Sequence, residues 1–261
     1  MIRVHDLTKT FGEVTAVGGI TFDVEPGEIF AFLGPNGAGK TTTIQMLTTL
    51  LRPTSGSITI DGLDPAAHPL DVRRRFGIVF QDPSLDHELT ARENMDLHGI
   101  LYHVPRRVRA ERTQALLTLF ELWDRRDDRV KTFSGGMKRR LEIARGFLHT
   151  PKILFLDEPT LGLDPQSRNQ LWTHVKHLNA TEGVTVFLTT HYMDEAERVA
   201  HRIAIIDHGR IVAQGTPQDL KQQTGTDSLE EAFLALTGTS IREESAGAAD
   251  RMRQVARMWR K

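Results

Sequence analysis

The chain has 261 residues, of which 39 % are hydrophobic, which is enough to bury a large core in one domain with a lobe or in two small domains. Its 33 basic and 34 acidic residues leave a net charge of −1, so the basic excess typical of nucleic-acid-binding proteins is absent. The absence of cysteine excludes disulfide bonds and thiolate metal sites. Without a signal-peptide core or an apolar run of about 18 residues, the sequence favours a soluble or peripheral protein.

Short β-type segments dominate the start of the chain. We predict strands over 2–7, 14–17, 20–24 and 57–60. The last of these ends at Asp61-Gly62, a dipeptide typical of tight turns. These strands predict an antiparallel layer beside the apolar strand 29–33.

A glycine-rich loop directly follows the strand 29–33. It has the pattern G-x-x-x-x-G-K-[ST], and its residues are Gly34, Pro35, Asn36, Gly37, Ala38, Gly39, Lys40, Thr41 and Thr42. Glycines let backbone N–H groups face a phosphate, Lys40 can reach the outer phosphates, and the hydroxyl of Thr41 can hold Mg²⁺. Residues 41–51 are predicted to form the helix whose positive N-terminus faces this anion. The loop therefore predicts a nucleotide site without specifying a function.

A helical lobe is predicted in the middle of the chain. A short strand over 77–80 ends at Gln81, and the pattern from 83 to 133 is helical, with a capping box formed by Thr90 and Glu93. Apolar runs then alternate with helical segments, which indicates a parallel sheet, and they cover 153–156, 184–188 and 203–206. A turn leads into a last strand over 211–214. The predicted fold class is α/β: a P-loop NTPase (RecA-like) core with an antiparallel β subdomain and an inserted α-helical subdomain.

Two carboxylates follow the apolar strand 153–156. Asp157 and Glu158 stand at the carboxyl end of this strand, where ligands bind in open α/β sheets. Asp157 is suited to hold Mg²⁺ through water, and Glu158 can polarise an attacking water as a general base. An acidic strand end is also common on solvated surfaces, so this assignment depends on the glycine-rich loop upstream.

A second glycine-rich element precedes the predicted helix 138–145. It consists of Ser134, Gly135, Gly136 and Met137. Ser134 is a good N-cap, and the glycines expose N–H groups at a helix N-terminus, which predicts a second anion site. Taken alone, Ser-Gly-Gly is equally compatible with an ordinary capped helix.

Taken in order, these elements resemble the ATPase subunit of ABC transporters. The resemblance covers residues 1–236, and it rests on the P-loop, Gln81, the segments 133–137, 153–158 and 162–164, and His191. The Ser-Gly-Gly element separates this family from other P-loop classes. The resemblance implies ATP and Mg²⁺ as cofactors. It also implies a head-to-tail dimer in which the P-loop of one subunit and the Ser-Gly-Gly loop of its partner enclose one ATP.

The resemblance also implies roles for single residues. Gln81 would contact Mg²⁺ or the attacking water and couple the site to a membrane subunit. His191 would contact the γ-phosphate and the water, Asp164 would cross the dimer interface, and Phe11 would stack on adenine. The chain departs from the family pattern at Met137, where Gln is common, and at Phe133, where Leu is common. The resemblance therefore leaves open whether the Met137 side chain contacts the nucleotide. The contacts that it implies for Ser134 and for the backbone N–H donors of this loop are unaffected.

The predicted organisation has four segments. A core with the antiparallel layer and the P-loop spans 1–82, a helical subdomain spans 83–145, the core continues over 146–236, and a C-terminal extension covers 237–261. Within that extension, the basic residues 251–261 place Met252, Val255, Ala256 and Trp259 on one helical face. A basic amphipathic helix can lie on anionic lipid or dock to a membrane subunit, and a solvated tail is the alternative.

The partners expected from the resemblance are a second ATPase subunit, identical or homologous, and transmembrane permease subunits, on the cytoplasmic face of the cell membrane. The segments 79–82, 190–197 and 229–234 resemble exporter ATPases for drugs, polysaccharides and other hydrophobic cargo. One alternative is a soluble ABC ATPase acting on DNA or ribosomes. Such proteins usually have two modules, a coiled-coil insertion or a basic face, none of which the sequence contains. Another alternative, a P-loop kinase, would not explain Ser134-Gly135-Gly136 or His191.

Overall fold

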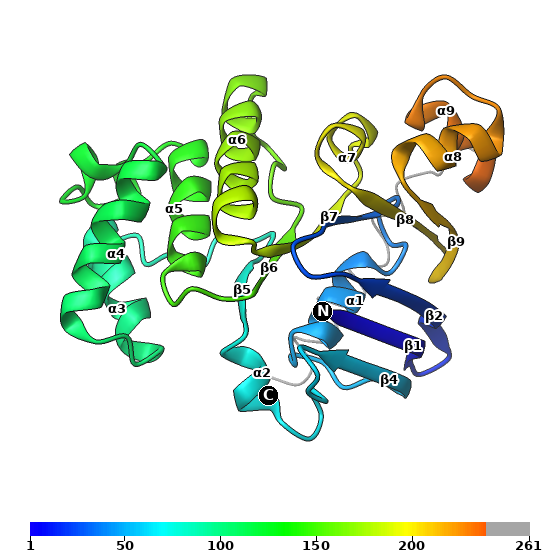
Figure 1. Cartoon of the computed structure of the whole chain (residues 1–261), viewed down its shortest axis with the longest axis horizontal. Helices are drawn as coiled ribbons and strands as arrows, with labels where there is room; N and C mark the ends of the chain where they lie inside the picture. Colours follow the sequence, from blue (N-terminus) through cyan, green and yellow to red (C-terminus); the bar gives the residue numbers. More distant parts are fainter. Residues whose placement is uncertain (239–261) are drawn as a thin grey trace.

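The computed structural model describes residues 1–238, so the predicted amphipathic helix after residue 241 lies outside the described residues. A six-stranded sheet runs through the centre of the molecule (Figure 1) in the order β5-β6-β7-β3-β8-β9. Its strands are β3 (Ile29–Leu33), β5 (Phe76–Val79), β6 (Ile153–Asp157), β7 (Thr185–Thr190), β8 (Arg202–Asp207) and β9 (Arg210–Gly215). All neighbouring pairs are parallel except β8 and β9, which confirms the predicted parallel sheet.

A second, antiparallel sheet lies beside the first and confirms the predicted layer. It has the order β2-β1-β4, with β1 (Ile2–Phe11), β2 (Val14–Val24) and β4 (Ser55–Ile60). The prediction of two strands over 14–17 and 20–24 is wrong, because β2 is continuous. Leu7 pairs with Ile20 and Thr8 with Gly18, so Gly19, with φ of +73°, is an extra residue in the ladder. Glycine here forms a bulge and does not end the strand.

The tight turn after β4 is confirmed. Asp61 and Gly62 have φ of +49° and +81°, and Ile60 and Leu63 exchange backbone hydrogen bonds of 2.8 and 2.9 Å. Two central residues with positive φ favour the type I′ turn that suits a twisted hairpin.

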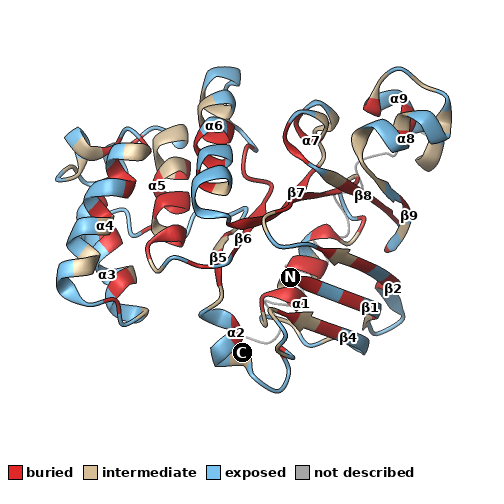
Figure 2. Ribbon diagram, viewed as in Figure 1, coloured by how far each residue is buried: buried red, intermediate tan, exposed pale blue. Residues whose placement is uncertain are grey.

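The central sheet is buried on both faces. All five side chains of β3 are buried, and because they alternate between faces, Ile29, Ala31 and Leu33 join one hydrophobic core while Phe30 and Phe32 join another. The first core includes residues of α5 (Gly135–Phe147) and α6 (Pro165–Glu182); the second includes residues of α1 (Lys40–Leu47) and the antiparallel sheet. Figure 2 shows the buried strands between the helices and the small sheet.

The predicted helical segment packs at the end of the sheet that carries β5 (Figure 1). It contains α3 (Ala91–Leu101), α4 (Arg106–Leu119), the short helices η1 (Trp123–Arg125) and η2 (Val130–Thr132), and α5. The capping box of α3 is confirmed, because Glu93 N donates to Thr90 Oγ1 (3.1 Å) and Thr90 N donates to Glu93 Oε2 (2.7 Å). The remaining helices are α2 (Pro69–Arg73), α7 (Met193–Val199), α8 (Pro217–Thr224) and α9 (Leu229–Thr237).

The helix after the P-loop is shorter than predicted. The prediction extended it to residue 51, but α1 ends at Leu47 and Thr49 has φ of +64°. The N–H groups of Leu50 and Leu51 both donate to Gln45 O, so the backbone turns back at this point. Within residues 1–238, none of the helices has both the length and the apolar composition needed to span a bilayer.

Candidate active site

The P-loop joins β3 to α1 and requires glycine at two points. A Cβ atom on Gly34 would lie 2.3 Å from Ile206 O, and one on Gly39, where φ is +106°, would lie 2.5 Å from Ala16 O. Both obstacles are backbone atoms, so no side-chain rotation can relieve them. The two glycines thus let the loop pass close to β2 and β8 and bring the N-terminus of α1 to the carboxyl end of the sheet.

Lys40 is held inside this loop. Its Nζ donates to Gly34 O (2.6 Å) and Pro35 O (3.2 Å), and it lies 3.1 Å from Glu158 Oε1. Both charged side chains are 6 % exposed. The structure therefore brings together the predicted phosphate-binding lysine and the predicted general base, a contact that the sequence analysis did not predict.

Thr41 and Asp157 meet beside this pair. Thr41 Oγ1 lies 3.5 Å from Asp157 Oδ1, and Thr189 Oγ1 donates to the same oxygen at 2.6 Å. Burial raises the pKa of Asp157, the hydrogen bond from Thr189 opposes this, and the charge of Glu158 raises it further. Hydroxyl and carboxylate oxygens are the hard ligands that Mg²⁺ prefers, so the pair fits the predicted metal.

No group of three or more His, Asp or Glu side chains within residues 1–238 is placed to hold a metal ion.

Glu158 lies between Lys40 and His191. His191 Nδ1 is 2.8 Å from Glu158 Oε2, and Glu158 is only 5 % exposed. Burial acts to raise the pKa of Glu158, but the hydrogen bond from His191 and the charge of Lys40 outweigh it, so the pKa lies below its ordinary value. The carboxylate is therefore ionised at neutral pH and able to accept a proton from a water molecule.

Two predicted residues lie outside this cluster. Gln81 follows β5, is exposed, and its side chain makes no hydrogen bond to another described residue. Phe11 ends β1, is 44 % exposed, and has Lys9 Nζ 5.1 Å from its ring centre. An exposed ring of this kind is available for stacking. The roles of Gln81 and Phe11 stay predictions.

The second glycine-rich element begins α5. Ser134 is its N-cap as predicted, because Ser134 Oγ accepts a bond of 3.2 Å from Met137 N. Ser134 and Gly135 are exposed, and a Cβ atom on Gly135 would meet only Leu163 Cδ2, at 4.0 Å. Met137, in contrast, packs against the hydrophobic core.

Asp164 and Gly136 are linked through Ser167. Asp164 caps α6, since its Oδ1 accepts from Ser167 N (3.0 Å) and its Oδ2 from Ser167 Oγ (2.7 Å). These hydrogen bonds lower the pKa of Asp164. A Cβ atom on Gly136 would come within 2.7 Å of the same Ser167 Oγ.

The sequence analysis missed two residues that support the site. Thr189, whose hydroxyl binds Asp157, follows the apolar run 184–188, and a polar residue at the end of a buried strand could have identified it. Arg139 binds the backbone of the segment 157–159. Its signal was the spacing to Glu142, which places an acidic partner one turn further along the buried face of α5.

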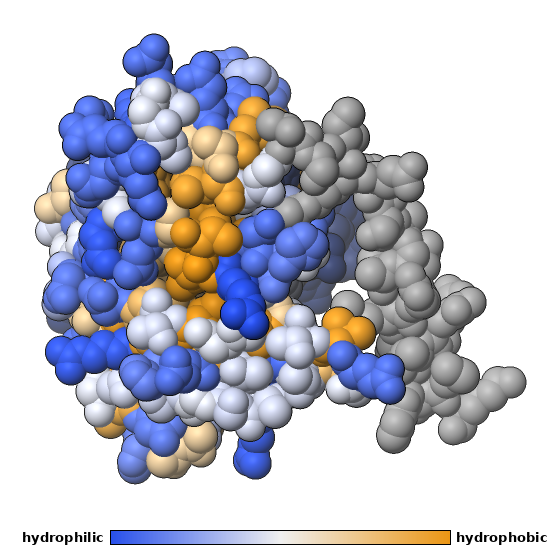
Figure 3. All heavy atoms as spheres, turned by 90° about the vertical axis from the view of Figure 1, so that its right-hand side faces the viewer, coloured by the Kyte–Doolittle hydropathy of each residue, from blue (hydrophilic) through white to orange (hydrophobic). Residues whose placement is uncertain are grey.

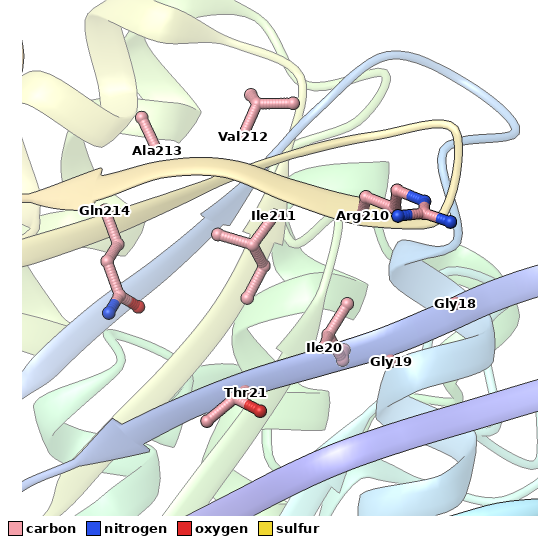
Figure 4. A pocket seen from close by; sticks show the side chains of 9 residues that line it. All are labelled: Gly18, Gly19, Ile20, Thr21, Arg210, Ile211, Val212, Ala213 and Gln214. Carbon is pink, nitrogen blue, oxygen red and sulfur yellow. The ribbon is translucent and has the colours of Figure 1, made fainter.

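Two hollows of the described surface lie away from the predicted site residues. A groove of about 390 Å³ lies between Gly18–Thr21 of β2 and Arg210–Gln214 of β9 (Figure 4). Figure 3 views the side of the molecule that carries β9, α8 and α9, where hydrophobic residues form a band on a mostly hydrophilic face.

A phosphate-binding loop at a helix N-terminus, a hydroxyl–carboxylate pair and an ionised glutamate beside a histidine define a nucleotide-hydrolysing P-loop protein. Comparison with known proteins agrees. Residues 17–161 match the family described as "ABC transporter".

Similar proteins include the daunorubicin/doxorubicin resistance ATP-binding protein DrrA of Streptomyces peucetius, 47 % identical over 228 residues, or 87 % of this chain and 69 % of that protein. The linearmycin resistance ATP-binding protein LnrL of Bacillus subtilis is 42 % identical over 243 residues, or 93 % and 76 %. A solved ATP-binding subunit of an ABC transporter matches with a TM-score of 0.83 and 34 % identity over 90 % of this chain and 99 % of that one. A dimeric ATP-binding cassette with ADP and Pi matches with a TM-score of 0.74 and 28 % identity over 83 % and 98 %.

The chain therefore belongs to the ABC transporter family, of which it is an ATP-binding subunit with ATPase activity. This confirms the resemblance, the fold class and the ATP and Mg²⁺ requirement that the sequence predicted.

Proposed function

We propose that this ATPase works as a head-to-tail dimer and drives export through separate transmembrane permease subunits. The observation that carries the proposal is the division of the site. Glu158 contacts both Lys40 and His191, whereas Ser134 and Gly135 are exposed and form no hydrogen bond with these three residues. The exposed pair is thus available to a nucleotide held by a second subunit.

Within one subunit, the residues Gly34 to Thr42 cradle the phosphates of ATP, and Lys40 neutralises the outer ones. Thr41 and Asp157, together with Gln81, would hold Mg²⁺, and the bound ion would neutralise phosphate charge. Phe11 stacks on the adenine.

Glu158 accepts the proton of the attacking water on its carboxylate. His191, which is hydrogen-bonded to Glu158 Oε2, orients this carboxylate. His191 would also contact the γ-phosphate of bound ATP. Lys40 is shared between Glu158 and the loop carbonyls, so phosphates that draw Lys40 away leave Glu158 a stronger base at the moment it is needed.

Across the dimer, Ser134, Gly135 and Gly136 bind the phosphates of the partner's ATP, and Asp164 lies at the interface. Met137 packs into its own core, which supports contact through the backbone donors and Ser134 rather than through residue 137.

The cargo is proposed from the relatives. Besides the two drug-resistance proteins, the Nod factor export ATP-binding protein I of Ralstonia nicotianae is 41 % identical over 231 residues. These names support export of hydrophobic or drug-like compounds and do not favour action on DNA or ribosomes. The subunit would sit peripherally on the cytoplasmic face of the membrane against its permease.

The domain boundaries after residues 82, 145 and 236 remain part of this proposal. The segment between the first two contains α3, α4 and α5 up to Arg145.

A mixing experiment tests the shared site. Gly135→Asp places a carboxylate against the partner's γ-phosphate, and the open space around Gly135 predicts a folded variant that still binds ATP. Lys40→Ala removes the cation of the P-loop, so it should lose ATP binding. Each variant alone should be inactive, but the mixed dimer has one site with both halves intact and should regain ATPase activity. Gly135→Asn, nearly the same size without the charge, is the control and should keep far more activity than Gly135→Asp.

A crosslink decides whether an inactive mixture reflects coupled sites or a site within one chain. Cysteines introduced at Ser134 and Gly37 in the Glu158→Gln background should join two chains only when ATP is present. Without any interchain crosslink, the trans arrangement is rejected.

A further inference from the structure

Arg139 is a buried arginine on the first turns of α5, with 7 % of its surface exposed. Its Nε donates to Pro159 O (2.7 Å), its Nη2 to Asp157 O and Glu158 O (3.0 Å each), and its Nη1 to Phe80 O and to Glu142 Oε2 (3.0 Å). A guanidinium has five N–H donors, so every donor of Arg139 has an acceptor.

Three of these acceptors are consecutive backbone carbonyls around Glu158. Glu158 itself has φ of +48°, in the left-handed region that an L-residue adopts only when its surroundings hold it there. Its N–H donates to Thr189 Oγ1 at 3.1 Å and to Thr189 O at 3.2 Å. The unfavourable conformation is therefore fixed from both sides, by Thr189 on the N–H and by Arg139 on the carbonyls.

This backbone conformation decides where the Glu158 carboxylate lies. The carboxylate reaches Lys40 Nζ at 3.1 Å and His191 Nδ1 at 2.8 Å. Arg139 touches only backbone atoms of this segment, so it acts on the carboxylate through the turn. Displacement of a reacting group by about 1 Å can lower a rate by about 10²-fold.

The charge of Arg139 is balanced locally. Glu142, only 2 % exposed, accepts from Arg139 and also from Ser84 N at 2.7 Å. Together with the bond to Phe80 O, this ties the segment 80–84, which contains Gln81, to the same guanidinium. Since a carboxylate already pairs with it, Arg139 is not a free cation for phosphate.

We propose that Arg139 is a positioning residue for ATP hydrolysis: it holds the turn 157–159 so that Glu158 can act as the base, and it joins that turn to α5 and to the segment 80–84. This rests on the proposed role of Glu158. A change in the position of α5, which begins with the Ser134–Gly135 element, is thereby transmitted to the catalytic carboxylate of the same subunit.

Substitution of Arg139 tests the proposal. Arg139→Met keeps the apolar stem and removes all five donors, and kcat should fall by about 10–10²-fold. The Kd for fluorescent ATP, measured with the full chain, should stay within about threefold, because the P-loop and Lys40 are unchanged. Arg139→Lys should give an intermediate kcat, because an ammonium has three donors without the planar fork.

Arg109→Met is the matched control. Arg109 is a largely buried arginine of α4 that pairs with Asp96 and donates to Val104 O at 3.1 Å. Its loss should lower the melting temperature but leave kcat close to wild type.

A double variant separates positioning from general damage. In the Glu158→Gln background the residue that Arg139 positions no longer acts as a base, so adding Arg139→Met should not lower the single-turnover rate further. Equal fold losses in the wild-type and Glu158→Gln backgrounds would overturn the proposal. So would a folded Arg139→Lys with wild-type kcat, which remains decisive if Arg139→Met does not fold. If Glu158→Gln itself is as fast as wild type, the proposed role of Glu158 fails instead.

Discussion

Replacement of Glu158 by glutamine removes a negative charge and a proton acceptor while the side chain keeps its shape. The carboxylate contacts Lys40 through Oε1 at 3.1 Å and His191 through Oε2 at 2.8 Å. An amide of the same size can still accept the bond from Lys40, so the fold and the P-loop should persist. What the amide cannot do is take the proton of the attacking water.

The expected loss follows from that chemistry. A positioned general base contributes about 10²–10⁴-fold to a rate, which corresponds to about 3–5 kcal/mol of transition-state stabilisation. ATP affinity should rise or stay unchanged, because Glu158 competes with phosphate for Lys40. We therefore expect kcat to fall by about 10²–10⁴-fold while the Kd for ATP stays equal to or below that of wild type.

The assay is phosphate release for kcat and titration with a fluorescent nucleotide for Kd. Sedimentation with ATP should also show a dimer that persists, because the closed pair cannot proceed to hydrolysis. Glu28→Gln is the control, since Glu28 is also buried (7 % exposed) and ion-paired, to Arg202 at 3.4 Å, but precedes the amino end of β3. Near-normal turnover in Glu158→Gln, or an equal loss in Glu28→Gln, would refute the reasoning.

Two further predictions concern pH and the P-loop. Because the folded-state pKa of Glu158 lies below its ordinary value of 4.5, its ionisation stabilises the fold above that pH, and this contribution is lost as the pH falls through the lowered value. Urea titrations between about pH 3 and pH 7 measure the free energy of unfolding, and at the acidic end the value for wild type should fall toward, or below, that for Glu158→Gln. A difference in unfolding free energy between the two proteins that does not change with pH would contradict this. Gly34→Ala, whose Cβ would lie 2.3 Å from a backbone oxygen, should lower both the melting temperature and ATP affinity. Gly62 also has a positive φ (+81°), but there is open space around its Cβ position. Gly62→Ala should therefore cost only the backbone strain of about 1–2 kcal/mol and leave ATP affinity unchanged. Equal effects of Gly34→Ala and Gly62→Ala on ATP affinity would count against the argument from the close approach of Gly34 to Ile206 O.

Local chemistry explains which elements the sequence could predict. The P-loop glycines, the Ser134 cap and the Thr90 capping box depend on neighbours within a few residues, and each occurs as predicted. The two wrong predictions, the division of β2 and the length of α1, concern features that do not follow from neighbouring residues alone. The bulge at Gly19 depends on the register with β1, and the end of α1 depends on how Thr49 turns the backbone; neither is written in a local pattern.

The site shows the same limit. Asp157, Glu158 and His191 could be selected because each stands at a strand end or within a motif. The pairing of Lys40 with Glu158 could not, because it arises only when β3 and β6 are assembled in one sheet. Arg139 was harder still, because its partners are mostly carbonyl groups, which every residue has, and a basic residue on a helix is normally solvated.

Gly136 leaves little room beside Ser167, so the start of α5 lies close to the start of α6. Any side chain at position 136 would meet the Ser167 hydroxyl, and that hydroxyl is already committed to Asp164. A side chain at position 136 would therefore require the Ser167 hydroxyl to move, which would break its hydrogen bond with Asp164. A larger residue at position 136 is thus expected to disturb the N-cap of α6 as well as the start of α5.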